Sequence, residues 1–190
     1  MKDWIKSGGY KKGQAVMEYL ITYGLALFVI LIVLAILVAV VLPSLQAPET
    51  CQFTQPGFGC SSKKHVLVSE SNNEVNLIFQ LDNQQGKSVK IIDVLCSSTS
   101  PANIRKSDVS SYGTEVNMTI TGGESLSIGA EEADITEDIE CVDESGSRVV
   151  LPPGSNFKGS IGVTYEFTDE VPGAPDRLAV ATVTGNTQEG

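Results

Sequence analysis

The sequence has few of the residues on which catalytic and metal sites depend. His65 is its one histidine, and none of the four cysteines stands in a C-x-x-C pair, so a zinc site is not expected. There is no G-x-S-x-G motif and no glycine-rich phosphate loop ahead of a helix. His65 lies in the stretch SSKKHVLV, which predicts that it is an exposed residue at the edge of a strand. The sequence therefore predicts no enzyme, no metal site and no cofactor.

Positive charge is absent from a long stretch in the second half of the chain. From Asp108 to Glu144 there are eleven acids and no lysine or arginine, and the whole chain has a formal net charge of −10. A surface of this sign repels phosphate groups, so nucleic acid is not an expected partner. The stretch contains no loop with calcium-ligand spacing and a turn glycine, and is therefore interpreted as a solvated face.

Charge of either sign is absent from the thirty residues between Glu18 and Glu49. Within this run, the 23 residues from Leu20 to Leu42 would form a helix about 34 Å long, enough to cross the core of a bilayer. Pro43 is expected to end the helix. The run is preceded by lysines, which predict a cytoplasmic start and place the acidic remainder of the chain outside.

All four cysteines follow the apolar run, on the side expected to lie outside the cytoplasm. An even number of cysteines in that compartment predicts disulfides. Three connectivities are possible. Proximity in the sequence favours Cys51 with Cys60, which closes the loop CQFTQPGFGC, and Cys96 with Cys141, which joins two distant strands.

Three processing sites compete at the N-terminal segment. A secretory cut after the apolar run, at Ala47, is disfavoured by the flanking Leu45 and Pro48, and no cysteine stands in a lipoprotein pattern. The third site is the Gly13–Gln14 bond, ahead of the apolar run. Cleavage there removes a short basic leader with a local charge of +3 and leaves the apolar helix at the new N-terminus.

The junction Lys11-Lys12-Gly13-Gln14-Ala15-x-x-Glu18-Tyr19, followed by an unbroken apolar run, resembles the class III signal peptide of archaeal type IV pilins. The resemblance is specific from Lys11 to Pro43 and only general beyond it. It implies that a prepilin peptidase cuts between Gly13 and Gln14 and that a pilus assembly machinery takes up the membrane-inserted precursor. Archaellins share this route, but their junction usually lacks the Gln…Glu-Tyr pattern, so an adhesion pilin is favoured over an archaellin-like subunit.

Glu18 has a physical role in this interpretation. Cleavage gives Gln14 a free ammonium group, which would enter the apolar interior of a helix bundle. An unpaired buried charge is costly, whereas an opposite charge recovers much of the desolvation penalty. Glu18 is therefore expected to accept the ammonium of Gln14 in a neighbouring subunit and to set the axial register. The alternative is that Glu18 lies in the headgroup region of the membrane.

The fold class predicted from these patterns is α+β, with a long N-terminal hydrophobic helix and an all-β, immunoglobulin-like sandwich. The expected organisation is a leader at 1–13, a helix at 14–43, a linker with a small disulfide loop at 44–64 and a β domain at 65–190. No helix is expected after Pro43. Alternating apolar residues predict strands at 75–81, 88–96, 115–121, 125–128, 135–142, 159–167 and 178–184.

Asn117 starts the triplet Asn-Met-Thr, which satisfies the N-glycosylation pattern and is the one such site in the chain. The function predicted overall is a structural subunit that polymerises with copies of itself through its N-terminal helix, giving a cell-surface filament for adhesion. The alternative is an uncleaved, membrane-anchored β-sandwich that binds a partner at the cell surface. The two differ at the Gly13–Gln14 bond.

Overall fold

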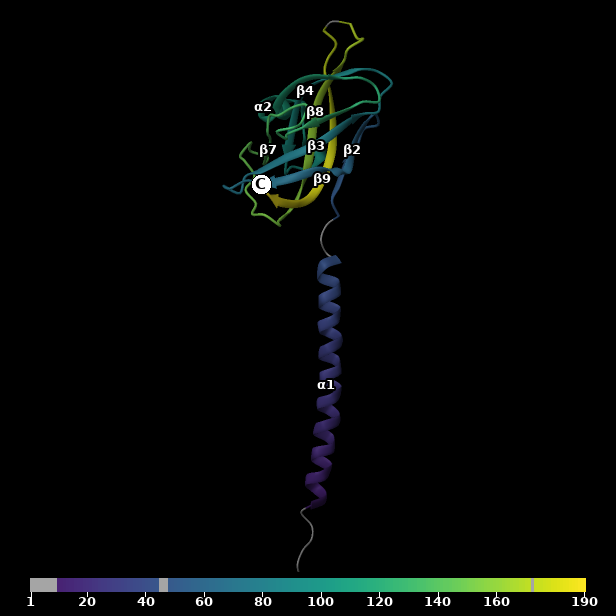
Figure 1. The fold of residues 1–190 in the computed structure, drawn as a ribbon, viewed down its shortest axis with the longest axis vertical. Coiled ribbons are helices and arrows are strands. Elements are labelled where there is room, and N and C mark those ends of the chain that lie inside the picture. The colour runs from purple at the N-terminus through teal and green to yellow at the C-terminus, as the bar shows by residue number, and fades with distance from the viewer. Residues whose placement is uncertain (1–9, 45–47, 172) are drawn as a thin grey trace, which may run out of the picture. The chain divides into compact units, whose positions relative to one another are not determined.

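The computed structural model describes the backbone of residues 10–44, 48–171 and 173–190. It also describes the side chains of these residues, except for those of 10–15, 40–44 and 61–64. Tertiary contacts divide the chain into two units, Met1–Gln46 and Ala47–Gly190. Helix α1 belongs to the first unit and all strands belong to the second (Figure 1). Of the predicted leader 1–13, residues 1–9 lie outside the described residues.

Helix α1 runs without a break from Tyr10 to Ser44 (Figure 1). It contains the predicted helix and extends beyond it at both ends. Pro43 lies in the last turn rather than after it, and the helix ends one residue later, at Ser44. The segment Val16–Ala39 is long and apolar enough to cross a membrane, and none of it is buried within the chain.

The second unit consists mainly of strands, and all seven strands expected from alternation are present. The elements are β1 (Thr50–Phe53), β2 (Phe58–Ser69), β3 (Val75–Asn83), β4 (Val89–Ser97), η1 (Pro101–Asn103), α2 (Lys106–Tyr112), β5 (Thr114–Ile120), β6 (Ser125–Ile128), β7 (Ile139–Val142), β8 (Asn156–Phe167) and β9 (Arg177–Glu189). Strand β7 is shorter than the predicted 135–142, because Ile135 forms an isolated bridge with Ile128 instead.

Four elements were not expected from the sequence. The residues interpreted as a linker, 44–64, contain β1 and the first part of β2. The prediction that no helix follows Pro43 is wrong: η1 and α2 both lie between β4 and β5. With seven residues, α2 is too short for an apolar periodicity to show in the sequence. It buries a single residue, Val109, and the Asp108 carboxylate caps its start by accepting the backbone N–H of Arg105 at 2.9 Å.

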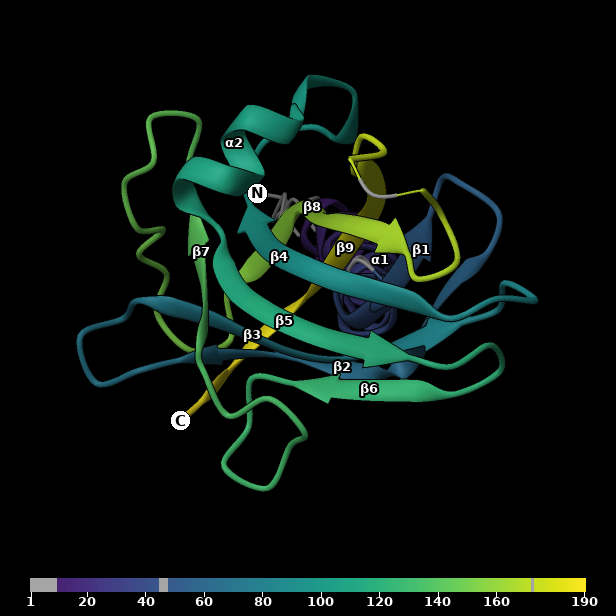
Figure 2. The ribbon, with the colours of Figure 1, turned by 90° about the horizontal axis from the view of Figure 1, so that it is seen from above.

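The strands form a closed barrel, and the prediction of an immunoglobulin-like sandwich is corrected accordingly. Each strand pairs with the next around the ring β9–β2–β3–β7–β4–β8, and β8 pairs with β9 again. Strands β4, β5 and β8 lie on one side of this unit and β2, β3 and β6 on the other (Figure 2). Two short parallel pairings, β2 with β9 and β4 with β7, join these sides. A sandwich would leave those edges open.

The interior of the barrel is filled by the alternate residues of its strands, as the period of two requires. Leu77, Phe79 and Leu81 of β3 are at most 1% exposed, and Ile161 and Val163 of β8 are fully buried. Burying each such side chain contributes about 1.5–3 kcal/mol. The side chains of both disulfides belong to the same core cluster or pack against it.

One disulfide lies at each of the two seams where the sides of the barrel meet. Cys51 of β1, a strand that pairs with β9, is bonded to Cys60 of β2. Cys96 of β4 is bonded to Cys141 of β7, its direct partner in the short parallel ladder. This is the connectivity that sequence proximity favours. Each disulfide therefore adds a covalent bond beside a short ladder, which has three residue pairs between β2 and β9 and two between β4 and β7.

His65 is buried, at 6% exposure, so the expectation of an exposed strand edge is wrong. It lies on β2 beside the first seam, where its Nε2 is 3.1 Å from the carbonyl oxygen of Thr184 on β9. Its Nδ1 has no hydrogen-bond partner among the described residues. The sequence marks position 65 as part of a strand, but the closure of β2 against β9 decides that this face is inside.

Candidate functional site

The predicted processing site lies in the first turn of α1. The helix begins at Tyr10, so the Gly13–Gln14 bond is helical, and Glu18 follows Gln14 by four residues. Residues four apart lie on one face of a helix, one turn from each other. If the chain is cut after Gly13, the new ammonium and the Glu18 carboxylate therefore share a face. Pairing of Gln14 with a neighbour's Glu18 is a contact between chains and stays a prediction.

The side chains around Glu18 on α1 are exposed, and the polar ones interact along the helix. The Thr22 hydroxyl donates a hydrogen bond to the Glu18 carbonyl oxygen, which satisfies the hydroxyl without an outside partner. Tyr19 and Tyr23 stack with ring centroids 5.9 Å apart and an interplanar angle of 8°. Among the described side chains of α1, from Val16 to Ala39, Glu18 is the one charged residue, and its carboxylate accepts no hydrogen bond from them.

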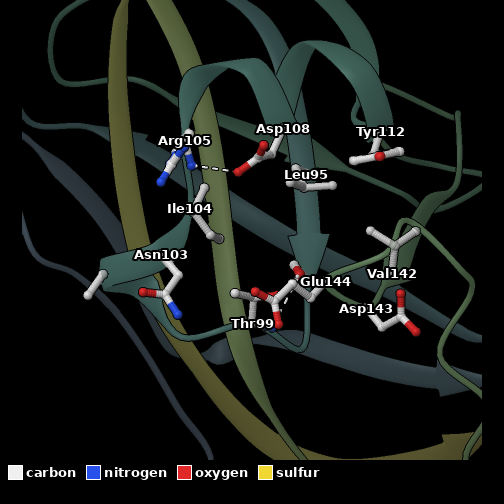
Figure 3. A pocket seen from close by; sticks show the side chains of 12 residues that line it. Leu95, Thr99, Asn103, Ile104, Arg105, Asp108, Tyr112, Val142, Asp143 and Glu144 are labelled. Atoms are coloured by element: carbon white, nitrogen blue, oxygen red, sulfur yellow. Dashed lines mark hydrogen bonds between the residues drawn. The ribbon is translucent and has the colours of Figure 1, made fainter.

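A pocket of about 500 Å³ lies beside η1 and α2 in the barrel unit (Figure 3). The ends of β4 and β7 form its floor, and the chain from η1 to α2 forms one wall. Leu95 and Val142 of the floor and Ile104 of the wall are apolar, and each is at most 7% exposed. Tyr112, at the end of α2, also lines it and is 47% exposed.

The polar part of this pocket was not predicted from the sequence. Asp143, which follows β7, accepts three hydrogen bonds at its Oδ1, from the Ser145 hydroxyl at 2.7 Å and from the backbone N–H groups of Ser145 and Ser147. The hydroxyl bond is the largest cause of the lowered pKa of Asp143. The pattern Asp-x-Ser-x-Ser is a local signal for such a turn. The sequence does not show that η1 and α2 fold over it.

Asn117, the predicted glycosylation site, is exposed on β5, whose described pairing is with β4 alone. The register between β4 and β5 shifts at this point, and Asn117 has a φ of 48°. Asparagine tolerates this left-handed conformation better than most residues. The side-chain amide donates to the Glu115 carboxylate across the bulge. The acceptor is thus accessible, and its occupancy by a glycan stays a prediction.

No catalytic or metal-binding cluster is found among the residues that the structure describes. His65 has a backbone carbonyl as its one hydrogen-bond partner there, so it forms no pair with a nucleophile. Within the same residues, no three His, Cys, Asp or Glu side chains are placed to hold a metal ion. The two features with unusual surface chemistry are therefore the exposed apolar helix α1 and the pocket beside η1.

Ion pairs at the barrel surface lower the pKa of several carboxylates. Arg148 forms ion pairs with Glu74 of the β2–β3 turn and with Glu140 of β7. Its hydrogen bond is the largest cause of the lowered pKa of Glu74. Arg177 binds both oxygens of Glu170 at 2.6 Å and likewise lowers the pKa of that carboxyl.

Acid is expected to destabilise the barrel because of these lowered pKa values. A carboxyl whose folded pKa lies below its unfolded value, about 3.9 for Asp and 4.3 for Glu, stabilises the fold above that value. This contribution is lost as the pH falls through the folded pKa. The melting temperature of the full-length chain in detergent, followed by circular dichroism, should therefore be nearly constant from pH 8 to 5 and fall below about pH 4.

Two variants make this expectation specific. Glu74→Gln should reduce the fall in melting temperature at acid pH, because its carboxylate no longer has to be protonated. Glu131→Gln is the control, since the Glu131 carboxylate forms no ion pair or hydrogen bond within the described residues. A melting temperature that does not change between pH 7 and pH 3 would contradict the prediction.

Comparison with protein-family models, with curated proteins and with solved structures finds no match to this chain. The class of protein is therefore defined by the structure alone. The chain has an apolar N-terminal helix of the kind that inserts into membranes or directs export, and a disulfide-bonded β-barrel of the kind found outside the cytoplasm.

Proposed function

We propose that the chain is a structural subunit, a pilin, of an archaeal type IV-like adhesion pilus. The observation that carries the proposal is the exposed apolar surface of α1, interrupted by a single acid four residues after the Gly13–Gln14 bond. In this proposal a prepilin peptidase removes residues 1–13. The helix is stored in the membrane and then packs with helices of other copies in a filament core. The barrel lies outside the cell.

The apolar surface of α1 supports association over the part of the helix whose side chains the structure describes. Large apolar side chains from Val16 to Val38 are 42–68% exposed, including Leu20, Phe28 and Leu34. Such a surface is stable only in lipid or against other apolar surfaces. Helices that contact each other head to tail need not close into a ring, so their association forms a filament.

Glu18 distinguishes this proposal from a simple membrane anchor. An anchor has no need of a carboxylate at the start of its apolar run, and a charge that enters the hydrocarbon is costly, by about 2.5 kcal/mol or more at the centre of a bilayer. A cleaved subunit brings a new ammonium group close to that carboxylate, so each charge can compensate the other. The Glu18 carboxylate is therefore expected to lie in a filament core, beside the ammonium that forms when the Lys-rich leader is removed.

The N-terminus of the native protein tests the proposal. Intact-mass measurement and N-terminal sequencing of the protein from its own cells should find Gln14 as the first residue. A start at Met1 would favour the alternative, an uncleaved single-pass anchor that presents the barrel as a binding protein. A start beyond Pro43 would show that the helix is removed as an ordinary signal, and would refute both readings of α1.

Electron microscopy shows whether the protein that is cleaved at the Gly13–Gln14 bond forms a filament. Surface appendages purified from the cells should contain this chain as a main component, identified by mass spectrometry. A Gln14 start in protein that is found only as single copies in the membrane would refute the structural role while leaving the cleavage site correct.

A further inference from the structure

Among the barrel side chains that the structure describes, one base at a pocket, Arg105, has no carboxylate within 4.0 Å. Among the described side chains, Lys87, Lys90, Lys106, Arg148 and Arg177 each lie within 4.0 Å of a carboxylate. Arg105 and Lys158 have no such partner in the same part of the chain. Lys158 projects from the outside of β8, whereas Arg105 lines the pocket beside η1 and α2.

Carboxylates with free oxygens line the other end of this pocket. In Figure 3 Arg105 lies at one end, Asp143 and Glu144 lie at the other, and Leu95 and Ile104 lie between them. All three hydrogen bonds to Asp143 end on its Oδ1, so its Oδ2 accepts none from the described residues. Glu144 is exposed and has no hydrogen bond there either.

Asp108 is the third acid of the pocket, and it is already engaged. Its Oδ2 accepts the backbone N–H of Arg105 at 2.9 Å, and its Oδ1 accepts the Ser107 hydroxyl at 3.2 Å. The Asp108 carboxylate does not form an ion pair with the Arg105 guanidinium, since no oxygen of the one lies within 4.0 Å of a nitrogen of the other. The guanidinium therefore keeps its donors for an outside acceptor.

We propose that this pocket binds the C-terminal lysine of a polypeptide. The ammonium of the lysine lies at Asp143 and Glu144, its methylene chain lies over Leu95 and Ile104, and its terminal carboxylate lies at Arg105. The ligand is an ω-amino carboxylate, the chemistry that a pocket with opposite charges at its two ends and an apolar floor recognises.

Each part of the ligand has a physical reason in the pocket. A guanidinium binds a carboxylate by two parallel hydrogen bonds, which fixes orientation as well as charge. The methylene groups contact the small exposed parts of Leu95 and Ile104, which places an apolar chain between the two charged ends. The acidic stretch from Asp108 to Glu144 draws the ammonium toward the pocket from a distance. Free lysine fits less well, because its α-ammonium would face Arg105.

Isothermal titration calorimetry on the full-length chain in detergent micelles tests the proposal. The probe is N-acetylglycyl-lysine, and empty micelles give the blank. Its C-terminal amide, which lacks the carboxylate, and N-acetylglycyl-norleucine, which lacks the ammonium, should each bind at least about tenfold more weakly, the effect of one charged hydrogen-bonded contact. Free lysine should bind more weakly than the probe. Equal binding of all four, or no binding of the probe, would overturn the proposal.

Variants at the two ends of the pocket give a second, independent measurement of binding. Arg105→Gln should weaken the probe about tenfold and leave the affinity for the amide unchanged, and it keeps the backbone N–H that Asp108 caps. Glu144→Gln should weaken the probe and leave the norleucine peptide unchanged. Lys158→Gln and Glu131→Gln are the matched controls outside the pocket. An equal loss in a control variant, or a loss of both the probe and the amide in Arg105→Gln, would show that the pocket is not the site.

Discussion

Glu18→Ala is expected to abolish filament formation while leaving membrane insertion and leader cleavage intact. In the proposed filament the ammonium of Gln14 loses its partner and is left as an unpaired charge in an apolar core. Removing one partner of a buried ion pair costs about 3–5 kcal/mol. Each addition of a subunit would then be weakened by about two to four orders of magnitude. Filament mass in the sheared surface fraction is the measurement.

Two further variants show whether the charge of Glu18 is responsible. Glu18→Gln keeps the size and polarity of the side chain without its charge, and should fail in the same way. Glu49→Ala removes the next acid along the chain, which lies beyond the apolar run, and should assemble normally. Wild-type filament yield from both Glu18 variants would remove the register role and leave the description of α1 unchanged.

Replacing Cys96 and Cys141 together by alanine is expected to cost the barrel about 4 kcal/mol of unfolding free energy. The bond closes a loop of 45 residues, and restricting a chain of that length in the unfolded state gives about this value. Domains are stable by only about 5–15 kcal/mol in total, so much of the stability would be lost. The melting temperature should fall by about 10 °C.

The second disulfide provides a matched comparison. Cys51 and Cys60 close a loop of nine residues, so the double alanine variant should lose about 2.6 kcal/mol. Both variants remove one seam bond, and they differ in the length of the loop. Denaturant unfolding of the two variants and the wild type in the same detergent measures the difference. A larger loss from Cys51 and Cys60 would contradict the loop-length argument.

The cysteine bond at the second seam also reinforces a very short ladder. Strands β4 and β7 pair over only two positions, Cys96 with Cys141 and Ser97 with Val142. Two ladder positions supply little resistance to separation, and parallel pairs are slightly less stable for each residue. Loss of the bond is therefore expected to open β7 from β4 before the long β8–β9 ladder separates. In the double variant, hydrogen exchange should increase first at Ser98, whose backbone N–H donates to the Val142 carbonyl oxygen at 2.9 Å across this ladder.

Several features of this chain follow from its sequence alone. The uncharged run after Glu18 determines an apolar helix, because no other structure satisfies the backbone of so long an apolar segment. Alternation of apolar residues predicts seven of the strands, and the connectivity that proximity favours among the cysteines is the one in the structure. These signals are local: each depends on residues that are neighbours in the chain.

The tertiary structure alone decided the closure of the barrel, the burial of His65 and the pocket beside η1. Alternation shows which face of a strand is buried, but it does not show which strand lies beside it. The seams join Leu67 to Thr187 and Cys96 to Cys141, residues far apart in the chain, through two or three pairs each. So few contacts leave no periodic pattern, and their free energy is gained only when the whole barrel forms.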